Sequence, residues 1–143
     1  MSLTESQSQQ VATLLNERNQ LTVQYTSASV AEHAGNYLVH LGARDEVLAC
    51  VEVKRVQWYQ CEVLHLTVAA AQERKGHGKA LLCEAEKAAR ARGARLLQCT
   101  IREDNSASRG LFENFGFSQV GTFHNKNSGN NVAIFQKVLA NAS

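Results

Sequence analysis

The sequence predicts a mixed α/β fold with a single sheet that is antiparallel at its start and crosses over in parallel at its centre. Three observations lead to this fold class. Apolar residues recur at helical spacing in several segments, and other short segments have the composition and alternation of strands. The connections also change along the chain, because hairpin-length links come first and the order strand, helix, strand follows from residue 61 onward.

The first segment predicts a helix over residues 4–18. Ser2 and Glu5 have the spacing of a capping box, and the apolar residues behind them recur at helical intervals: Val11, Leu14 and Leu15. Residues 21–26 are rich in β-favouring side chains and predict a strand. The Ser/Ala-rich stretch that runs from there to Gly35 is interpreted as either a loop or a short helix.

Three strands are predicted next, at residues 37–41, 47–56 and 61–68. The first two are separated by a connection that suits a hairpin, and a second tight connection leads into the third. Alternation along the third strand gives one apolar row, which begins with Glu62 and continues with Leu64, Leu66 and Val68.

The pattern then changes to a helix between two strands. Residues 78–92 carry apolar side chains on one helical face, and Gly93 is suited to end the helix as a C-terminal cap. Residues 95–101 predict a buried strand. A strand that follows another strand through a helix is expected to lie parallel to it, so residues 61–68 and 95–101 predict the parallel centre of the sheet.

The last third predicts one more helix and a hairpin. The capping residues at 104–106 announce the helix, and Gly116 ends it. Strands at residues 118–123 and 132–138 flank a turn-rich segment that contains Asn, Ser and Gly, so they are expected to pair as a hairpin.

Composition limits the classes of protein to consider. A chain of 143 residues, 44% hydrophobic and 20% charged, is suited to a single globular domain over residues 1–143. We expect no membrane association, because no apolar run approaches the roughly 18 residues of a span, and a cytoplasmic location, because the start lacks a secretory pattern. A net charge of +2 is too small to indicate a nucleic-acid partner. The four widely spaced cysteines indicate no metal site and no disulfide framework.

The segment Glu73-Arg74-Lys75-Gly76-His77-Gly78, followed by Lys79, is the most informative in the chain. It precedes a helix, whose first amides are unpaired and lie at the positive end of the helix dipole. Glycines let a phosphate approach those amides, and the basic side chains add positive charge, so the segment predicts a phosphate-binding loop. A glycine-containing turn with solvated basic residues is the alternative that this segment alone leaves open.

Two familiar phosphate motifs are excluded. A P-loop needs Ser or Thr after its lysine, and here Lys79 is followed by Ala80. A dinucleotide fingerprint needs a third glycine three residues after Gly78, where Leu81 stands.

With these residues in view, the chain resembles the GNAT superfamily of N-acetyltransferases. The superfamily signature is a strand, then Q/R-x-x-G-x-G/A, then a helix, and residues 64–82 follow that order. A second stretch, residues 105–117, resembles the family's Asn-led helix that ends in a Gly-Phe pair. The two stretches lie within residues 61–117, and the predicted hairpins before and after them fit the same GNAT-like mixed sheet.

The resemblance implies that acetyl-CoA is the cosubstrate, without a metal, and that it lies where the two central parallel strands splay apart. It implies that the backbone of Leu66 and Val68 binds the pantetheine arm and that the loop binds the pyrophosphate through Glu73, Arg74, Lys75, Gly76, His77, Gly78 and Lys79. It further implies that Asn105 reaches the pantetheine and that Phe112 packs beside the thioester end.

Three positions depart from the family pattern. Glu73 stands where Gln or Arg is usual, and an acid there should slightly weaken phosphate binding, although Gln72 could take this place if the loop is shifted by one. Arg74 stands where Gly is common. Phe112 stands where many members carry a tyrosine that is thought to protonate the leaving thiolate, and phenylalanine cannot donate a proton. Ser108 or a water molecule are the substitutes that the sequence offers.

Acetyl transfer to an amine needs a base, because an ammonium group has no lone pair with which to attack. Several family members place a glutamate at the position of Glu62, so Glu62 is the candidate catalytic base; a solvated carboxylate at a strand end is the alternative. His65 is interpreted as a histidine satisfied by its surroundings rather than as a catalyst.

Two functions follow. The first is an N-acetyltransferase that moves acetyl directly to a primary amine of a small molecule or peptide. The second is a non-catalytic acyl-CoA-binding module that regulates a partner, which Phe112 and Glu73 suggest. The acceptor cannot be read from the sequence, and a monomer or a homodimer is expected.

Overall fold

A computed structural model describes residues 3–18 and 24–139 of the chain. It divides into two compact units, each made from two segments. Unit 1 comprises Met1–Glu52 and His65–Glu84, and unit 2 comprises Val53–Leu64 and Ala85–Ser143. A single domain over residues 1–143 stays a prediction, and the two units are described in turn.

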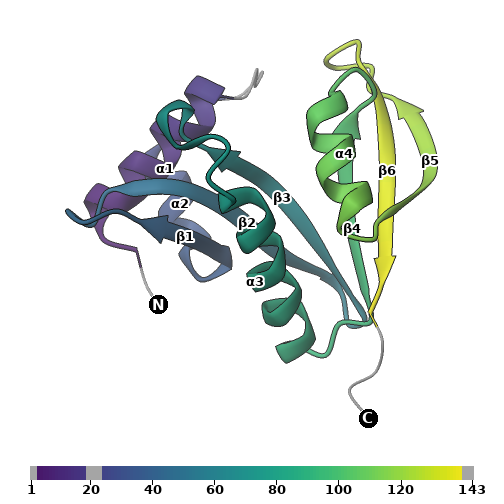
Figure 1. The fold of residues 1–143 in the computed structure, drawn as a ribbon, viewed down its shortest axis with the longest axis horizontal. Helices are drawn as coiled ribbons and strands as arrows, with labels where there is room; N and C mark the ends of the chain where they lie inside the picture. The colour runs from purple at the N-terminus through teal and green to yellow at the C-terminus, as the bar shows by residue number, and fades with distance from the viewer. Residues whose placement is uncertain (1–2, 19–23, 140–143) are drawn as a thin grey trace. The chain divides into compact units, whose positions relative to one another are not determined.

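The elements follow the predicted order with small changes at their ends (Figure 1). They are α1 (Glu5–Arg18), α2 (Ser27–Glu32), η1 (Ala34–Asn36), β1 (Tyr37–Leu41), β2 (Val47–Gln57), β3 (Gln60–Val68), η2 (Ala70–Gln72), α3 (His77–Ala91), β4 (Leu96–Arg102), α4 (Ser106–Asn114), β5 (Ser118–His124) and β6 (Asn131–Val138). The strands are hydrogen-bonded in the order β1-β2-β3-β4-β6-β5. The pair β3–β4 is parallel, whereas β1–β2, β4–β6 and β5–β6 are antiparallel, so the predicted mixed α/β fold class is confirmed.

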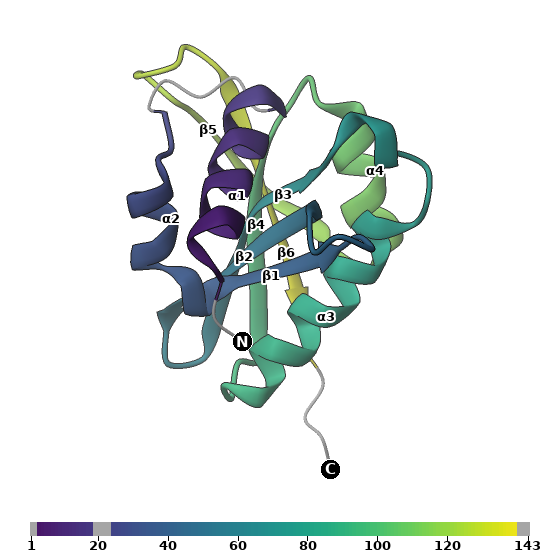
Figure 2. The same cartoon turned by 90° about the vertical axis from the view of Figure 1, so that its left-hand side faces the viewer.

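In unit 1, α1 and α2 pack against the β1–β2 hairpin. Their shared core is apolar and fully or nearly buried, and it contains Val11, Ala12, Leu14, Leu15, Val30, Tyr37 and Cys50. Figure 2 shows α1 and α2 on one side of the hairpin and the start of α3 on the other. The alternation of β1 follows from this arrangement, because Tyr37 and Val39 pack on the α1 side, whereas His40 contacts α3.

The strand predicted at residues 21–26 is not found in the described part of that segment. Residues 19–23 lie outside the described residues, and residues 24–26 carry no strand. Thr26 instead caps α2, because its side chain accepts from the amide of Ser29 while the Ser29 hydroxyl accepts from the amide of Thr26. This capping box resolves the ambiguity of the Ser/Ala-rich stretch in favour of a short helix.

Unit 2 is built on the antiparallel strands β4, β6 and β5, with α4 packed beside them (Figure 1). The end of α4 has the hydrogen bonds of a Schellman motif: the Gly116 amide donates to Glu113 and the Phe117 amide donates to Phe112. Gly116 has φ of 102°, a conformation that other residues rarely adopt. The motif brings the rings of Phe112 and Phe117 together, edge to face, with centroids 5.1 Å apart.

Strand β3 contains an irregularity that the sequence does not indicate. His65 has φ of 54°, which is unusual for any residue other than glycine. The most buried side chains of β3 are Cys61, Val63 and Thr67, whereas the apolar row expected from alternation, Leu64, Leu66 and Val68, is only partly buried. The ladder between β3 and β4 runs from Gln60 with Leu96 to Glu62 with Gln98.

Candidate functional site

The predicted phosphate loop of unit 1 has the backbone of an anion cradle. Gly76 has φ of 84° and Arg74 has φ of 65°, so the chain turns sharply twice before the helix. The carbonyl of Gly76 accepts the first helical hydrogen bond of α3, from the amide of Ala80 at 3.1 Å. The amides of residues 77–79 precede that bond, so the helix itself uses none of them. They are the donors that a phosphate needs, at the positive end of a 15-residue helix.

The acid in this loop has a cationic partner. Glu73 forms an ion pair with Arg18, which is at the last turn of α1. Both side chains are exposed, so the ion pair adds little stability. Arg18 nevertheless offsets the negative charge of Glu73, the residue that replaces the usual Gln or Arg of the family. The basic side chains of Arg74, Lys75 and Lys79 then give the loop a positive balance.

A histidine pair links the loop to the sheet within unit 1. His77 is the first residue of α3, and its Nδ1 lies 2.7 Å from Nδ1 of His40 on β1. The other ring nitrogen of His40, Nε2, lies 2.5 Å from Oε2 of Glu84 on the same helix. His77 and Glu84 are seven residues apart, so they fall on one helical face and flank the His40 ring.

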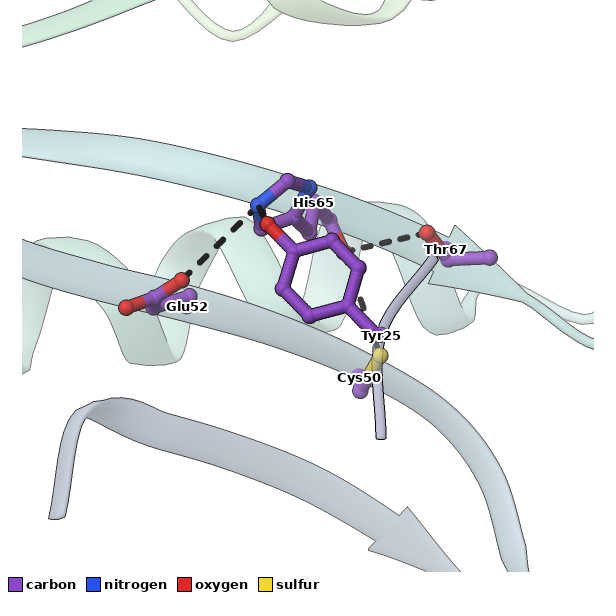
Figure 3. A network of polar contacts seen from close by, with 5 residues as sticks. All are labelled: Tyr25, Cys50, Glu52, His65 and Thr67. Carbon is purple, nitrogen blue, oxygen red and sulfur yellow. Dashed lines mark hydrogen bonds and ion pairs between the residues drawn. The ribbon is translucent and has the colours of Figure 1, made fainter. Parts of the chain in front are cut away.

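A second histidine network surrounds the irregularity in β3 (Figure 3). The hydroxyl of Tyr25 lies 2.6 Å from Nε2 of His65, and Glu52 Oε1 lies 3.9 Å from the same nitrogen. The carbonyl of His65 accepts from the Thr67 hydroxyl at 3.0 Å and from the Cys50 thiol at 3.8 Å. These contacts fix both the ring and the backbone of His65, directly before Leu66.

Burial controls the protonation of this network. It lowers the pKa of His65, and the carboxylate of Glu52 opposes that effect only in part. Burial and Glu52 both raise the pKa of Tyr25. At neutral pH His65 is therefore a neutral imidazole and Tyr25 a neutral phenol, which agrees with the interpretation of His65 as a histidine satisfied by its surroundings.

The candidate base, Glu62, lies in unit 2 and is held by its neighbours in the sheet. Gln98 Nε2 donates to Glu62 Oε1 at 3.1 Å, and Gln136 Nε2 donates to Gln98 Oε1 at 2.8 Å. The three residues are register partners across β3, β4 and β6, so they form one polar row. The carboxylate also raises the pKa of Cys99, although burial is the larger cause.

The two remaining predicted residues, Asn105 and Phe112, also lie in unit 2. Asn105 caps α4, because its side-chain oxygen accepts from the amide of Ser108 at 3.2 Å. Phe112 is 5% exposed and packs on Phe117, so packing accounts for its presence at this position.

Unit 1 thus holds nine of the predicted site residues: Leu66, Val68, Glu73, Arg74, Lys75, Gly76, His77, Gly78 and Lys79. Unit 2 holds Glu62, Asn105 and Phe112. Sequence reasoning did not single out His40, Tyr25 or the glutamines beside Glu62. The period-2 alternation of β1 signals that His40 faces away from the α1 core, but its partner lies 37 residues away and has no local signal.

Within residues 3–18 and 24–139, no group of three or more His, Cys, Asp or Glu side chains could hold a metal ion. In the same ranges, no helix is both long and apolar enough to cross a membrane.

Known proteins place these features in a family. The family model described as "Acetyltransferase (GNAT) family" matches residues 4–117, which include the loop, Glu62 and Asn105. No curated protein sequence matches the chain significantly.

Solved structures share the fold at low sequence identity. Ard1 from Thermoplasma volcanium is 16% identical, with a TM-score of 0.84 over 99% of this chain and 97% of that one. The ribosomal-protein-S18-alanine N-acetyltransferase from Escherichia coli is 18% identical, with a TM-score of 0.77 over 100% and 94%. The structure of yncA from Salmonella typhimurium with its cofactor acetyl-CoA is 15% identical, with a TM-score of 0.83 over 100% and 94%.

Proposed function

Because the chain belongs to the acetyltransferase (GNAT) family, we propose that it is an N-acetyltransferase that moves acetyl from acetyl-CoA directly to a primary amine. The acceptor we propose is a small molecule or a peptide. The E. coli neighbour is named for acetylating an alanine of a ribosomal protein, which favours including peptide amines among the candidates. Acetyl-CoA supplies a thioester whose thiol is already a fair leaving group, with a pKa of about 8.5.

The backbone of residues 73–79 is the observation that supports the proposal of CoA binding. Gly76 with its left-handed backbone, the three amides before Ala80 and the surrounding basic side chains fit a diphosphate. A Cβ added at Gly76 would meet no atom within 4 Å, so glycine is needed there for its conformation and for close approach rather than to avoid a clash inside the protein. We propose that residues 73–79 hold the pyrophosphate of CoA.

The remaining cofactor contacts are proposed from the family resemblance and from local structure. Leu66 and Val68 are partly exposed on β3, and we propose that their backbone pairs with an extended pantetheine arm. Asn105 and Phe112 are proposed to bind the pantetheine and the thioester end. Most of Phe112 is covered by protein, so its contact would be limited to the ring edge that stays open.

We propose Glu62 as the base that removes a proton from the acceptor amine. Its carboxylate is only partly buried, and the amide of Gln98 fixes one of its oxygens. A fixed carboxylate that solvent can reach is able to accept a proton and release it to water. Phe112 cannot act as the acid, so the leaving thiolate would take its proton from water or from Ser108.

The test is release of free thiol from acetyl-CoA in the presence of a panel of primary amines and N-terminal peptides. Glu62→Gln should lower turnover by about 10²-fold or more, chiefly at neutral and lower pH, while CoA affinity stays the same. Glu103→Gln is the matched control, because Glu103 is an exposed acid in the same unit. An unchanged pH–rate profile for Glu62→Gln would remove Glu62 from this role.

A non-catalytic acyl-CoA-binding module is the second candidate, and Phe112 in place of a hydroxyl-bearing residue is the observation that favours it. CoA binding without amine-dependent thiol release for any acceptor would support it.

We also propose a cytoplasmic location and a monomeric or homodimeric state for the protein. The free cysteines at positions 50, 61, 83 and 99 are in keeping with a reducing compartment.

A further inference from the structure

His40 reaches the phosphate loop from the sheet. It lies on the face of β1 that is turned away from the α1 core, and its register partner on β2 is Ala49. The next residue on that row of β2 is Val51, so β2 places no charged residue beside His40. The titratable groups in contact with the His40 ring are therefore His77 and Glu84, both from α3.

The short distance between the two histidines fixes how they share protons. Two Nδ1 atoms 2.7 Å apart must have one proton between them, because two lone pairs or two N–H groups would repel. The carboxylate of Glu84 accepts a hydrogen bond from Nε2–H of His40 at 2.5 Å, which is a charge-assisted distance. His40 therefore carries a proton on Nε2, and only the shared proton and Nε2 of His77 can vary.

One state with fewer protons and one with a further proton satisfy this geometry. In the latter the shared proton can lie on either Nδ1, and the carboxylate of Glu84 favours the form with the charge on His40. In the first, His77 Nδ1–H donates to His40 Nδ1, and Nε2 of His77 is left with a lone pair. In the second, the shared proton moves to His40 Nδ1, which then donates to His77 Nδ1, and one proton from solvent binds Nε2 of His77. The second state holds one proton more, and its imidazolium charge lies beside the carboxylate of Glu84.

An anion at the loop selects between the two states. A lone pair on His77 Nε2 repels a phosphate oxygen, whereas an N–H at the same atom donates to it. His77 stands between Gly76 and Gly78, in the segment proposed to hold the pyrophosphate. Arg74, Lys75 and Lys79 are in the same segment, and a bound diphosphate would offset their positive charge as well as that of the pair.

We propose that His40, His77 and Glu84 take up one proton together with the diphosphate of CoA, so that cofactor binding is linked to pH. This rests on the proposed function, in which residues 73–79 bind that diphosphate. His40 is a positioning residue, because it acts on the ligand through His77. The affinity for CoA should rise as pH falls across the histidine range, by at most about tenfold per pH unit for one proton.

The experiment is calorimetric titration with 3′-dephospho-CoA in two non-phosphate buffers of different ionisation enthalpy, at several values of pH between 5.5 and 8. This probe lacks the monoester phosphate, which would itself titrate near pH 6. The wild-type protein should show a buffer-dependent heat that corresponds to uptake of up to one proton. His40→Asn should still bind, with the uptake lost.

Two further variants sharpen the result. Glu84→Gln removes the carboxylate whose negative charge stabilises the imidazolium, so proton uptake on ligand binding should occur only at a lower pH. His33→Asn is the matched control, because His33 is an exposed histidine of the same unit outside the pair, and uptake should be retained. Binding without proton uptake in the wild-type protein, or equal uptake in His40→Asn, overturns the proton linkage alone. Absence of binding by every form overturns the proposed function as well.

Discussion

Two histidine networks in unit 1 differ in their partners rather than in their exposure. The side chains of His40 and His65 are 21% and 19% exposed, so access to water does not distinguish them. The carboxylate beside His40 lies at 2.5 Å and is 46% exposed, whereas the carboxylate beside His65 lies at 3.9 Å and is 8% exposed. The two histidines therefore differ in how close the neighbouring carboxylate lies and in how exposed that carboxylate is.

The comparison separates a network suited to respond to ligand from one suited to hold structure. His65 has a phenol at 2.6 Å, and burial lowers its pKa, so it stays neutral and its hydrogen bonds fix the backbone of β3. His40 is in contact with a residue of the candidate phosphate loop and with an acid that can compensate a cation. The same side chain therefore serves two purposes, which its contacts decide.

The largest expected effect comes from the loop that carries His77. In Gly76→Ala the left-handed backbone becomes strained by about 1–2 kcal/mol, so the loop relaxes to another conformation that CoA binding must reverse. The affinity for CoA should fall by roughly tenfold, measured by calorimetry.

Gly35→Ala is the matched control, because an added Cβ there also meets open space but Gly35 has no left-handed φ. Equal affinities for the two variants would mean that the backbone of the loop does not determine binding. In Gly76→Ala the free energy of unfolding should fall by less than the free energy of CoA binding, because the loop can relax in the free protein.

The next effect concerns the structural network. Tyr25→Phe removes the hydroxyl at 2.6 Å and leaves Nε2 of His65 unsatisfied in a mostly buried position, so unfolding by urea should show a loss of about 1–2 kcal/mol. Tyr59→Phe, at an exposed tyrosine, should lose less than about 0.5 kcal/mol. If Tyr25→Phe were as stable as Tyr59→Phe, the contact between Tyr25 and His65 would not contribute to stability.

A smaller effect should appear as a dependence of stability on pH. The folded-state pKa of His65 is below its unfolded value of about 6.5, so the unfolded chain binds a proton that the folded protein excludes. The contribution of neutral His65 is fully present above pH 6.5 and declines as pH falls towards the folded pKa, by at most about 1.4 kcal/mol per pH unit. Urea unfolding at pH 7.5 and 5.5 should give a steeper loss for the wild-type protein than for His65→Asn, and equal slopes would contradict this assignment.

The sequence predicted those parts of the molecule whose signals are local. The helices α3 and α4 follow from apolar spacing and capping residues, and the turn at Gly116 from the glycine itself. For α1 the apolar spacing alone was sufficient, because its capping box is formed by Thr4 and Gln7, whereas the predicted Ser2 lies outside the described residues. The parallel pair β3–β4 follows from the helix between the strands. The short α2 stayed ambiguous because its capping box uses Thr26 and Ser29, residues that are equally common in loops.

Features that depend on distant contacts could not be predicted in the same way. The ring of His65, whose backbone is left-handed, is held by Tyr25, 40 residues earlier. The buried row of β3 contains Cys61, Val63 and Thr67 rather than the expected apolar residues. The row Glu62, Gln98 and Gln136 needs the register of three strands. No local pattern contains either kind of information, which explains why the candidate base was predicted without its partners.

The smallest expected effect is a difference in thiol reactivity between two cysteines, one beside each histidine network. Cys50 donates to the carbonyl of His65 and is fully buried, and burial together with Glu52 raises its pKa to about 12. Cys83 precedes Glu84 on α3 and is exposed. A thiol reagent applied to the folded protein at pH 7.5 should therefore modify Cys83 rapidly and Cys50 only after unfolding, because reaction requires both access and a thiolate. Cys83→Ser should abolish the rapid phase, and rapid labelling assigned to Cys50 by peptide mapping in this variant would show that the His65 network opens in the native protein.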